Sequence, residues 1–345
     1  MSPLILLMMA LALGLGTTIA TMSSHWLLAW MGLEINTLAI IPLMIKHHHP
    51  RAVEATTKYF LTQATAAAML LFASTMNAWL TGVWEISQTM HPLPLTLVTL
   101  ALSLKMGLAP LHSWLPDIMQ GLDLKIGLVL TTWQKIAPFS LLFQTNNGTL
   151  TVLLGLISVI LGGWGGLNQT QLRKILAYSS IAHLGWMILV VQLSPLLSLM
   201  TLLIYIIMTF SLFNTFMLSK TTNINSLSTS WIKTPILAAL SPLILLSLGG
   251  LPPLTGFSPK WMILQELTKQ SLYVMATTVA LSALLSLYFY LRLAYSMTLT
   301  IAPNTSTNTP SWRLCSNNIF LATATSVVMT LLMLPLLPSM MTFMF

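Results

Sequence analysis

The sequence predicts an all-α polytopic membrane protein with about eleven transmembrane helices. Of its 345 residues, 56% are hydrophobic and only 6% are charged, and the mean hydropathy is +0.84. A composition this apolar excludes an ordinary soluble domain. In addition, apolar stretches recur at the length of about 20 residues that a helix needs to cross a bilayer.

Polar clusters separate these stretches and define the elements. The clusters lie at residues 22–24, 46–57, 84–91, 111–123, 144–149, 168–174, 192–194, 220–234 and 302–318. In chain order, we expect spans at 3–19, 26–45, between 57 and 84, 93–110, between 123 and 144, between 149 and 168, 177–191, between 194 and 220, 236–270, 272–297 and beyond 318. The glycine-rich run 162–166 lies inside a span, so it predicts close helix packing.

The ninth stretch is too long for one straight crossing. Its 35 residues would form a helix of about 52 Å. Pro252 and Pro253 interrupt it, because proline lacks a backbone donor and disfavours helix before it. We therefore expect one discontinuous helix that crosses once.

The distribution of basic residues supports this count. With eleven alternating crossings, only Lys269 falls on the face opposite the N-terminus. The other loop and helix-end cations share the N-terminal face, as the positive-inside rule expects; they are Lys46, Arg51, Lys58, Lys125, Arg173, Lys174, Lys220, Lys233, Arg292 and Arg313. Topology therefore explains the net charge of +8. The cations form no basic stripe of the kind that binds nucleic acid.

Four charged residues stand deep inside spans, away from their ends: Glu34, Lys105, Lys135 and Lys260. An ionisable group at bilayer depth costs roughly 2.5 to 3.5 kcal/mol and normally serves an ion, a proton or a partner charge. We expect Glu34 to pair with Lys105. A buried lysine loses its proton more readily than a solvated one and regains it beside a carboxylate, so a moving partner can load or release a proton. Static ion pairing that holds helices together is the alternative.

The interrupted spans indicate an internal repeat. Lys105 precedes Gly107 and Pro110, and Lys260 follows the second proline-rich break. These spans are five helices apart, an odd number, so the repeat is inverted in the membrane, as in many transporters. The predicted units are a first five-helix repeat at 1–146, a second at 147–298 that includes the broken helix 236–270, and a loop with a final helix at 299–345.

Two histidines could extend a proton path. His183 lies near the centre of the seventh span, and His112 lies just beyond Lys105. Imidazole can carry a proton between lysines that are too far apart for direct exchange. For His112 a helix-end hydrogen bond is an equal alternative. Asp117 and Asp123 fit either proton uptake or simple loop solvation.

Several kinds of site are not expected. The single Cys315 excludes an internal disulfide, a CxxC pair and a cysteine-bound metal. His47–His49 lie in a basic loop and are interpreted as solvated. No nucleotide-binding motif is present. The sequence thus predicts no cofactor or metal in this chain.

Three segments resemble a known family: residues 105–117 (KMGLAPLHSWLPD), 171–185 (QLRKILAYSSIAHLG) and 249–257 (GGLPPLTGF). Together they resemble the antiporter-like membrane subunits of proton-translocating NADH:ubiquinone oxidoreductase, respiratory complex I, in their mitochondrially encoded animal form. The resemblance covers essentially the whole chain. It implies inverted five-helix repeats and a Glu/Lys/Lys/Lys proton axis comprising Glu34, Lys105, Lys135 and Lys260. It also implies that three N-terminal helices of the bacterial relatives have no counterpart here.

The function that follows is proton translocation through a buried Glu/Lys/His axis, coupled to quinone reduction elsewhere in the complex. The resemblance implies that other subunits bind NADH, FMN, iron–sulfur clusters and ubiquinone. Expected partners are other core and accessory subunits, especially neighbouring antiporter-like subunits, and lipids such as cardiolipin. The expected location is the mitochondrial inner membrane, with the N-terminus in the matrix and the C-terminus in the intermembrane space. The alternatives are a stand-alone cation/proton antiporter and a structural membrane scaffold.

Overall fold

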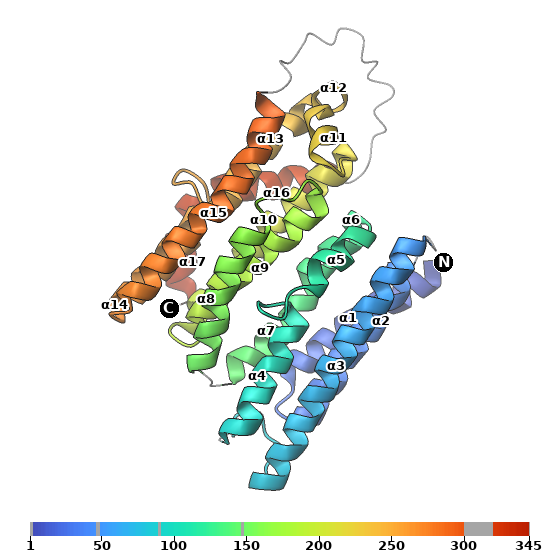
Figure 1. Ribbon diagram of the computed structural model, residues 1–345, viewed down its shortest axis with the longest axis vertical. Coiled ribbons are helices and arrows are strands. Elements are labelled where there is room, and N and C mark those ends of the chain that lie inside the picture. The colour runs from blue at the N-terminus through green and yellow to red at the C-terminus, as the bar shows by residue number, and fades with distance from the viewer. Residues whose placement is uncertain (1–2, 46–48, 89–90, 146–147, 300–319, 345) are drawn as a thin grey trace. The chain divides into compact units, whose positions relative to one another are not determined.

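The computed structural model describes residues 3–45, 49–88, 91–145, 148–299 and 320–344. Throughout these ranges the regular structure is helical (Figure 1), and the only extended pairings are two isolated bridges, His25 with Glu85 and Gln171 with Asn223. Lys46, His47, His48, Arg313 and Cys315 lie outside the described residues. The predicted all-α class is confirmed.

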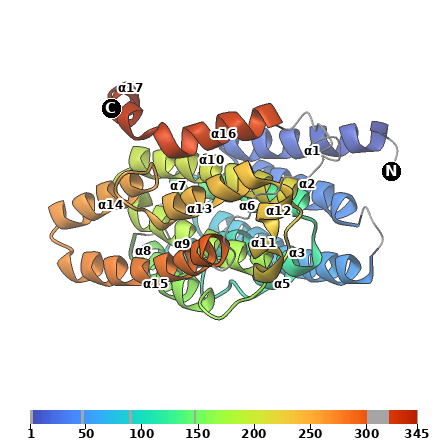
Figure 2. The ribbon, with the colours of Figure 1, turned by 90° about the horizontal axis from the view of Figure 1, so that it is seen from above.

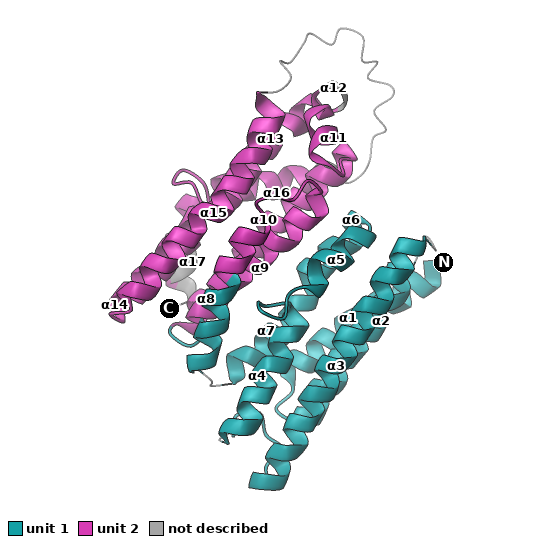
Figure 3. Ribbon diagram, viewed as in Figure 1, with its two compact units in different colours: residues 1–158, 191–193 teal, residues 159–190, 194–345 magenta. Residues whose placement is uncertain are grey.

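The chain divides into two compact units (Figure 3). Unit 1 comprises residues 1–158 and 191–193, and unit 2 comprises residues 159–190 and 194–345. The helices that begin in unit 1 are α1 (Pro3–Met22), α2 (Trp26–Met44), α3 (Pro50–Thr81), α4 (Pro92–Met106), α5 (Trp114–Gly121), α6 (Leu124–Thr131), α7 (Trp133–Gln144) and α8 (Gly148–Gly165), whose last turns belong to unit 2. The predicted repeat boundary near residue 146 stays a prediction.

The helices that lie wholly or almost wholly in unit 2 are α9 (Leu172–Val191), α10 (Pro195–Ser219), α11 (Ile224–Ser228), α12 (Ser230–Lys233), α13 (Pro235–Gly249), α14 (Phe257–Lys269), α15 (Tyr273–Thr298), α16 (Phe320–Leu332) and α17 (Leu337–Met344), with the 3₁₀ helix η2 (Leu334–Leu336). Within this unit α13 and α14 both pack against α15, and α10 packs against α13, α14 and α16 (Figure 2).

Small residues bring helices close together in both units. In unit 1, a Cβ atom on Gly32 would lie 2.9 Å from the carbonyl oxygen of Gly16, so only glycine permits this approach of α2 to α1. In unit 2, a Cβ atom on Gly162 would lie 2.6 Å from the backbone nitrogen of Ala182. The glycine-rich run therefore serves helix packing, as predicted, in the manner typical of membrane helices.

Eight helical segments in the described part of the chain are long and apolar enough to cross a membrane. Three shorter apolar helices accompany them: Pro92–Met106, Pro235–Gly249 and Leu321–Leu332. The first two end at the predicted interruptions. The protein is thus a polytopic membrane protein.

Candidate proton-translocation site

The first helix break ends α4 directly after Lys105. Gly107 takes φ +77°, and its N–H bonds the carbonyl oxygens of Ser103 and Leu104, which closes the helix as a left-handed glycine commonly does. The indole of Trp114, at the start of α5, donates to the same Leu104 carbonyl over 3.1 Å. The two helices are thus joined by a turn that satisfies backbone groups left open at the break.

Lys105 and Lys135 line one small cavity in unit 1. The two side chains come from α4 and α7, and the residues are only 6% and 3% exposed. The cavity measures about 10 Å³, close to the smallest space that holds one water molecule. The other residues that line it are Leu33, Thr37, Tyr59, Gln63, Met106, Trp114, Leu115, Leu130, Gln134 and Pro138. We refer to it as the lysine cavity.

Within the described part of the chain, the Nζ atom of Lys105 is buried and has no hydrogen-bond partner. An isolated ammonium in such surroundings is strongly unfavourable. A water molecule in the lysine cavity would supply the missing partner.

A hydrogen bond from Thr37 connects the Glu34 carboxylate to this cavity. The Thr37 hydroxyl lies 2.9 Å from Glu34 Oε2 and 2.9 Å from the Glu34 backbone carbonyl oxygen, and Thr37 itself lines the lysine cavity. Glu34 interacts electrostatically with Lys105. The direct Glu34–Lys105 pair stays a prediction.

Lys135 follows an irregularity between α6 and α7. Thr132 separates the two helices with distorted helical angles, φ −110° and ψ −69°, and Pro138 inside α7 has no N–H to bond the carbonyl of Gln134. The Gln134 side chain donates to the backbone carbonyl of Asn36 on α2 over 3.3 Å. This bond ties the Lys135 segment to the helix that carries Glu34.

The second helix break, in unit 2, places Lys260. Gly250 takes φ +81° and ends α13. Lys260 Nζ, on α14, donates to the backbone carbonyl of Gly249 over 2.8 Å. This carbonyl lies at the negative end of the α13 dipole, where a cation is favourable. The ammonium also lies 5.9 Å from the ring centre of Trp186, within cation–π range.

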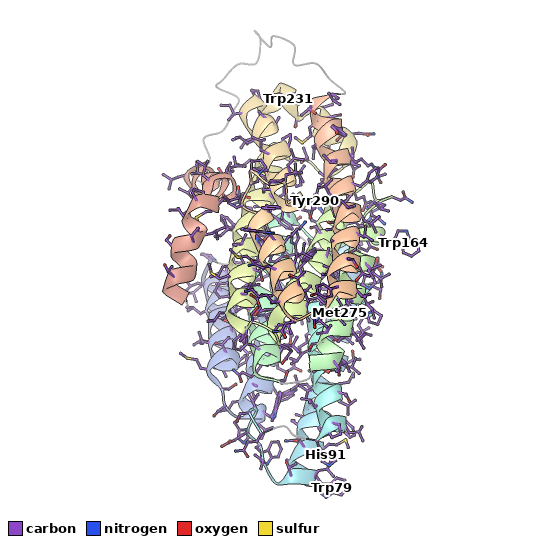
Figure 4. The ribbon with its side chains drawn as sticks, turned by 90° about the vertical axis from the view of Figure 1, so that its left-hand side faces the viewer. Trp79, His91, Trp164, Trp231, Met275 and Tyr290 are labelled. Atoms are coloured by element: carbon purple, nitrogen blue, oxygen red, sulfur yellow. The ribbon has the colours of Figure 1, made fainter. Side chains whose placement is uncertain are left out.

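His183 belongs to the same neighbourhood as Lys260. It lies one turn before Trp186 on α9, and its Nε2 is 3.4 Å from the Tyr290 hydroxyl. The ring of Tyr205 lies 5.7 Å from the imidazole centre. Figure 4 shows Tyr290 on α15. Unit 2 thus brings together His183 and Lys260, with aromatic residues around them.

His112 lies in the turn between α4 and α5. Its Nδ1 is 3.3 Å from the carbonyl oxygen of Pro110, and His112 is not among the residues that line the lysine cavity. This contact fits a helix-end hydrogen bond. A relay role for His112 stays a prediction.

Sequence reasoning missed Thr37, Trp186 and Tyr290. Trp186 stands three residues after His183, a spacing that shares a helix face and could have indicated it. Tyr290 carries no such signal, because it is 107 residues from His183. Among the described residues, no group of three His, Cys, Asp or Glu side chains could hold a metal.

Comparison with known proteins identifies relatives over the whole length. The family model for the transmembrane part of NADH:quinone oxidoreductase and Mrp antiporters matches residues 23–286, and that for the C-terminus of NADH dehydrogenase subunit 2 matches residues 287–341. The chain is 69% identical over 344 residues to NADH-ubiquinone oxidoreductase chain 2 of Tetraodon nigroviridis, with 99% of each chain covered. It is 63% identical over 342 residues to the Oncorhynchus mykiss protein of the same name, with 98% of each covered.

Solved structures share the fold. A chain of respiratory complex I from Thermus thermophilus with bound aureothin matches with a TM-score of 0.82 at 28% identity, covering 95% of this chain and 78% of that one. A chain of the Mrp complex from Dietzia sp. DQ12-45-1b matches with a TM-score of 0.81 at 17% identity, covering 97% and 75%. At 17% identity, the match to the Mrp complex chain shows a shared fold only.

Proposed function

The chain belongs to the family of NADH-ubiquinone oxidoreductase chain 2 proteins, and from this premise we propose that protons cross it by way of Glu34, Lys105, Lys135 and Lys260. It is a proton-translocating membrane-arm subunit of the H⁺-translocating NADH:quinone oxidoreductase, respiratory complex I. The proposal concerns the residues that carry the protons.

One observation carries it: Lys105 and Lys135 line a single cavity that also holds Thr37, the partner of the Glu34 carboxylate. A carboxylate that moves toward Lys105 stabilises its ammonium and favours proton uptake, and a carboxylate that moves away favours release. The second lysine in the cavity can receive the proton, because two ammonium groups in so small a space repel each other.

Lys260 and His183 form the second part of the proposed path. The bond of Lys260 to the Gly249 carbonyl holds its ammonium at the end of a broken helix, the kind of element that forms ion sites in transporters. His183, bonded to Tyr290, supplies a group that both accepts and donates a proton. Quinone reduction elsewhere in the complex would drive the charge movement along these residues.

We further propose the finer topology that the sequence indicates. The chain would cross the inner mitochondrial membrane eleven times, in two inverted five-helix repeats and a final helix. The basic loops would place the N-terminus in the matrix and the C-terminus in the intermembrane space. Anionic lipids such as cardiolipin would bind beside these loops, and other subunits would hold FMN, iron–sulfur clusters, NADH and ubiquinone.

The test is replacement of single lysines by methionine, which keeps the length of the side chain and removes its charge. In the intact complex reconstituted in vesicles, we expect Lys135→Met and Lys260→Met each to lower the rate of proton pumping about a hundredfold or more, the scale of a lost proton-transfer group. Lys269→Met is the matched control, because Lys269 is exposed and its salt bridge is at the surface.

The outcomes separate the alternatives. If assembled Lys135→Met and Lys260→Met complexes pump a normal number of protons per electron, the lysines only hold helices together and the proposed path is wrong. A chain that exchanges cations for protons without any redox partner would instead be an independent antiporter.

A further inference from the structure

A second cavity lies in unit 1, between the first turns of α3 and the end of α5. Its volume is about 230 Å³, and its lining residues are Arg51, Glu54, Ala55, Lys58, Asp117, Gln120 and Gly121. Four of these seven residues are charged, in a chain in which only 6% of all residues are charged. We refer to it as the outer cavity.

The charges of the outer cavity balance. Lys58 Nζ lies 2.7 Å from Glu54 Oε1, with side-chain exposures of 48% and 63%, so water reaches both groups. Asp117 interacts electrostatically with Lys58, and Arg51 with Glu54. Two positive and two negative groups leave no net charge to repel a hydrated proton, and two carboxylates line the cavity.

The outer cavity and the lysine cavity follow each other along the same two helices. On α3, positions 51, 55, 59 and 63 share one face; the first two line the outer cavity and the last two line the lysine cavity. On α5, Asp117 lines the outer cavity, and Trp114 and Leu115 line the lysine cavity. Ala55 and Gln63 are eight residues apart along α3, about 12 Å of helix.

An aromatic pair stands at the junction. The rings of Tyr59 and Trp114 meet edge to face at 6.1 Å between centres, and both residues line the lysine cavity. Tyr59 also interacts electrostatically with Glu34. Beyond the pair, at the outer end, a Cβ atom on Gly121 would lie 2.6 Å from the carbonyl oxygen of Arg51, so α5 is pressed tightly against α3 there.

We propose that the outer cavity is the aqueous mouth through which protons reach the lysine cavity, with the Tyr59–Trp114 pair as the barrier between them. A proton from bulk water is relayed by the carboxylates of Asp117 and Glu54, passes inward when the rings part and a water molecule bridges the gap, and binds to Lys105 when its amine is neutral. No bond other than those to the transferred proton changes. This inference rests on the proposed role of Lys105.

The test uses the assembled complex in vesicles and removes both acids at nearly constant shape. We expect the double variant Glu54→Gln, Asp117→Asn to lower the proton-pumping rate severalfold, and Asp117→Glu, which keeps the carboxylate, to retain most of it. Glu266→Gln is the matched control, because Glu266 forms a surface ion pair with Lys269 at the same 2.7 Å and faces neither cavity.

A labelling experiment covers the case in which the double variant fails to assemble. In a Cys315→Ser background, Asp117→Cys is assembled first and is then treated with a positively charged methanethiosulfonate reagent. We expect rapid modification, followed by a severalfold loss of pumping, whereas labelled Glu266→Cys pumps as before.

Two results would overturn the assignment: normal pumping by the assembled double variant, or labelled Asp117→Cys that pumps at its unlabelled rate. Lys105→Met distinguishes a failure of the outer cavity as the mouth from a failure of the proposed proton path. If Lys105→Met abolishes pumping while the outer-cavity variants pump normally, the mouth lies elsewhere and the proposed function stands. If Lys105→Met also pumps normally, the proposed function itself fails.

Discussion

At the scale of single residues, the buried lysines differ in how they are held. Lys260 has a backbone carbonyl at 2.8 Å and an aromatic ring nearby. Lys105 has no hydrogen-bond partner in the described part of the chain and faces a space for about one water molecule. The hydrogen bonding of Lys105 therefore depends on what enters that space, whereas that of Lys260 is already provided by the backbone.

Thr37 should act as a positioning residue for Glu34. Thr37→Val removes the hydroxyl that holds Glu34 Oε2 at 2.9 Å and keeps the shape of the side chain. We expect a severalfold lower proton-pumping rate in the assembled complex, because the carboxylate loses the hydroxyl that holds it beside the lysine cavity. Thr37→Ser retains the hydroxyl and should restore the rate. Normal pumping by Thr37→Val, or no rescue by Thr37→Ser, would contradict the role.

Gly250 should be required for the position of Lys260. Alanine at position 250 is unfavourable for two reasons. The backbone φ of this residue is +81°, and the added Cβ atom would lie 2.8 Å from Lys260 Cδ. Gly82→Ala is the control, because φ is +75° but nothing lies within 4 Å of the added atom.

Backbone strain should cost about 1–2 kcal/mol at both sites, and overpacking about 1–3 kcal/mol more at Gly250. The measurement is the temperature at which half of the assembled complex is lost on a native gel, together with pumping. Equal effects of the two substitutions would show that Lys260 does not depend on this contact.

At the scale of helices, both breaks follow one plan. Residues 107–113 and 250–256 each form a seven-residue interruption between two helices, and each begins with a glycine at positive φ. The lysines occupy opposite sides of the breaks: Lys105 is in the helix before its break, and Lys260 is in the helix after its break. A charged group beside open helix ends can exchange hydrogen bonds with them, which a continuous helix does not allow.

The packing of α1 against α2 should depend on glycine. In Gly32→Ala the added atom would lie 2.8 Å from the backbone nitrogen of Ala20 and 2.9 Å from the Gly16 carbonyl oxygen, so the two helices must separate. We expect a loss of about 1–3 kcal/mol in stability and less assembled complex on native gels. Gly14, also on α1, is the control: no atom lies within 4 Å of a Cβ atom added there, so Gly14→Ala should assemble normally. Normal assembly of Gly32→Ala would show that the helices adjust.

At the scale of the whole molecule, orientation follows from the charge of the loops. In a Cys315→Ser background, Asp123→Cys reports on the basic face and Ser87→Cys on the opposite face; both native residues are exposed. We expect a membrane-impermeant thiol reagent added to the matrix side to label Asp123→Cys and spare Ser87→Cys, because basic loops stay on the side of insertion. The reverse pattern would invert the proposed topology.

Assembly is the second property at this scale. We expect the chain to migrate on native gels with the band that oxidises NADH and that contains flavin and iron–sulfur clusters. If all of the chain migrated separately from the NADH-oxidising band, it would not be part of the complex.

The amino-acid pattern was enough to predict the all-α class, the approximate spans and the two helix breaks. Hydropathy and the backbone limits of glycine and proline act within a few residues, so their effects follow from the local sequence: the span expected at 26–45 is α2, Trp26–Met44, and the interruption expected in 236–270 separates α13 from α14. The cost of burying charge likewise indicated Lys105 and Lys135.

Which side chains contact one another follows from the packing of the helices and could not be predicted from the sequence. That Lys105 and Lys135 share a cavity, that Thr37 connects it to Glu34, and that the Tyr290 hydroxyl lies 3.4 Å from His183 all depend on how each helix is rotated about its axis and which neighbour it packs against. These arrangements result from many weak packing contacts between residues far apart in the chain, and no local pattern of residue types specifies them.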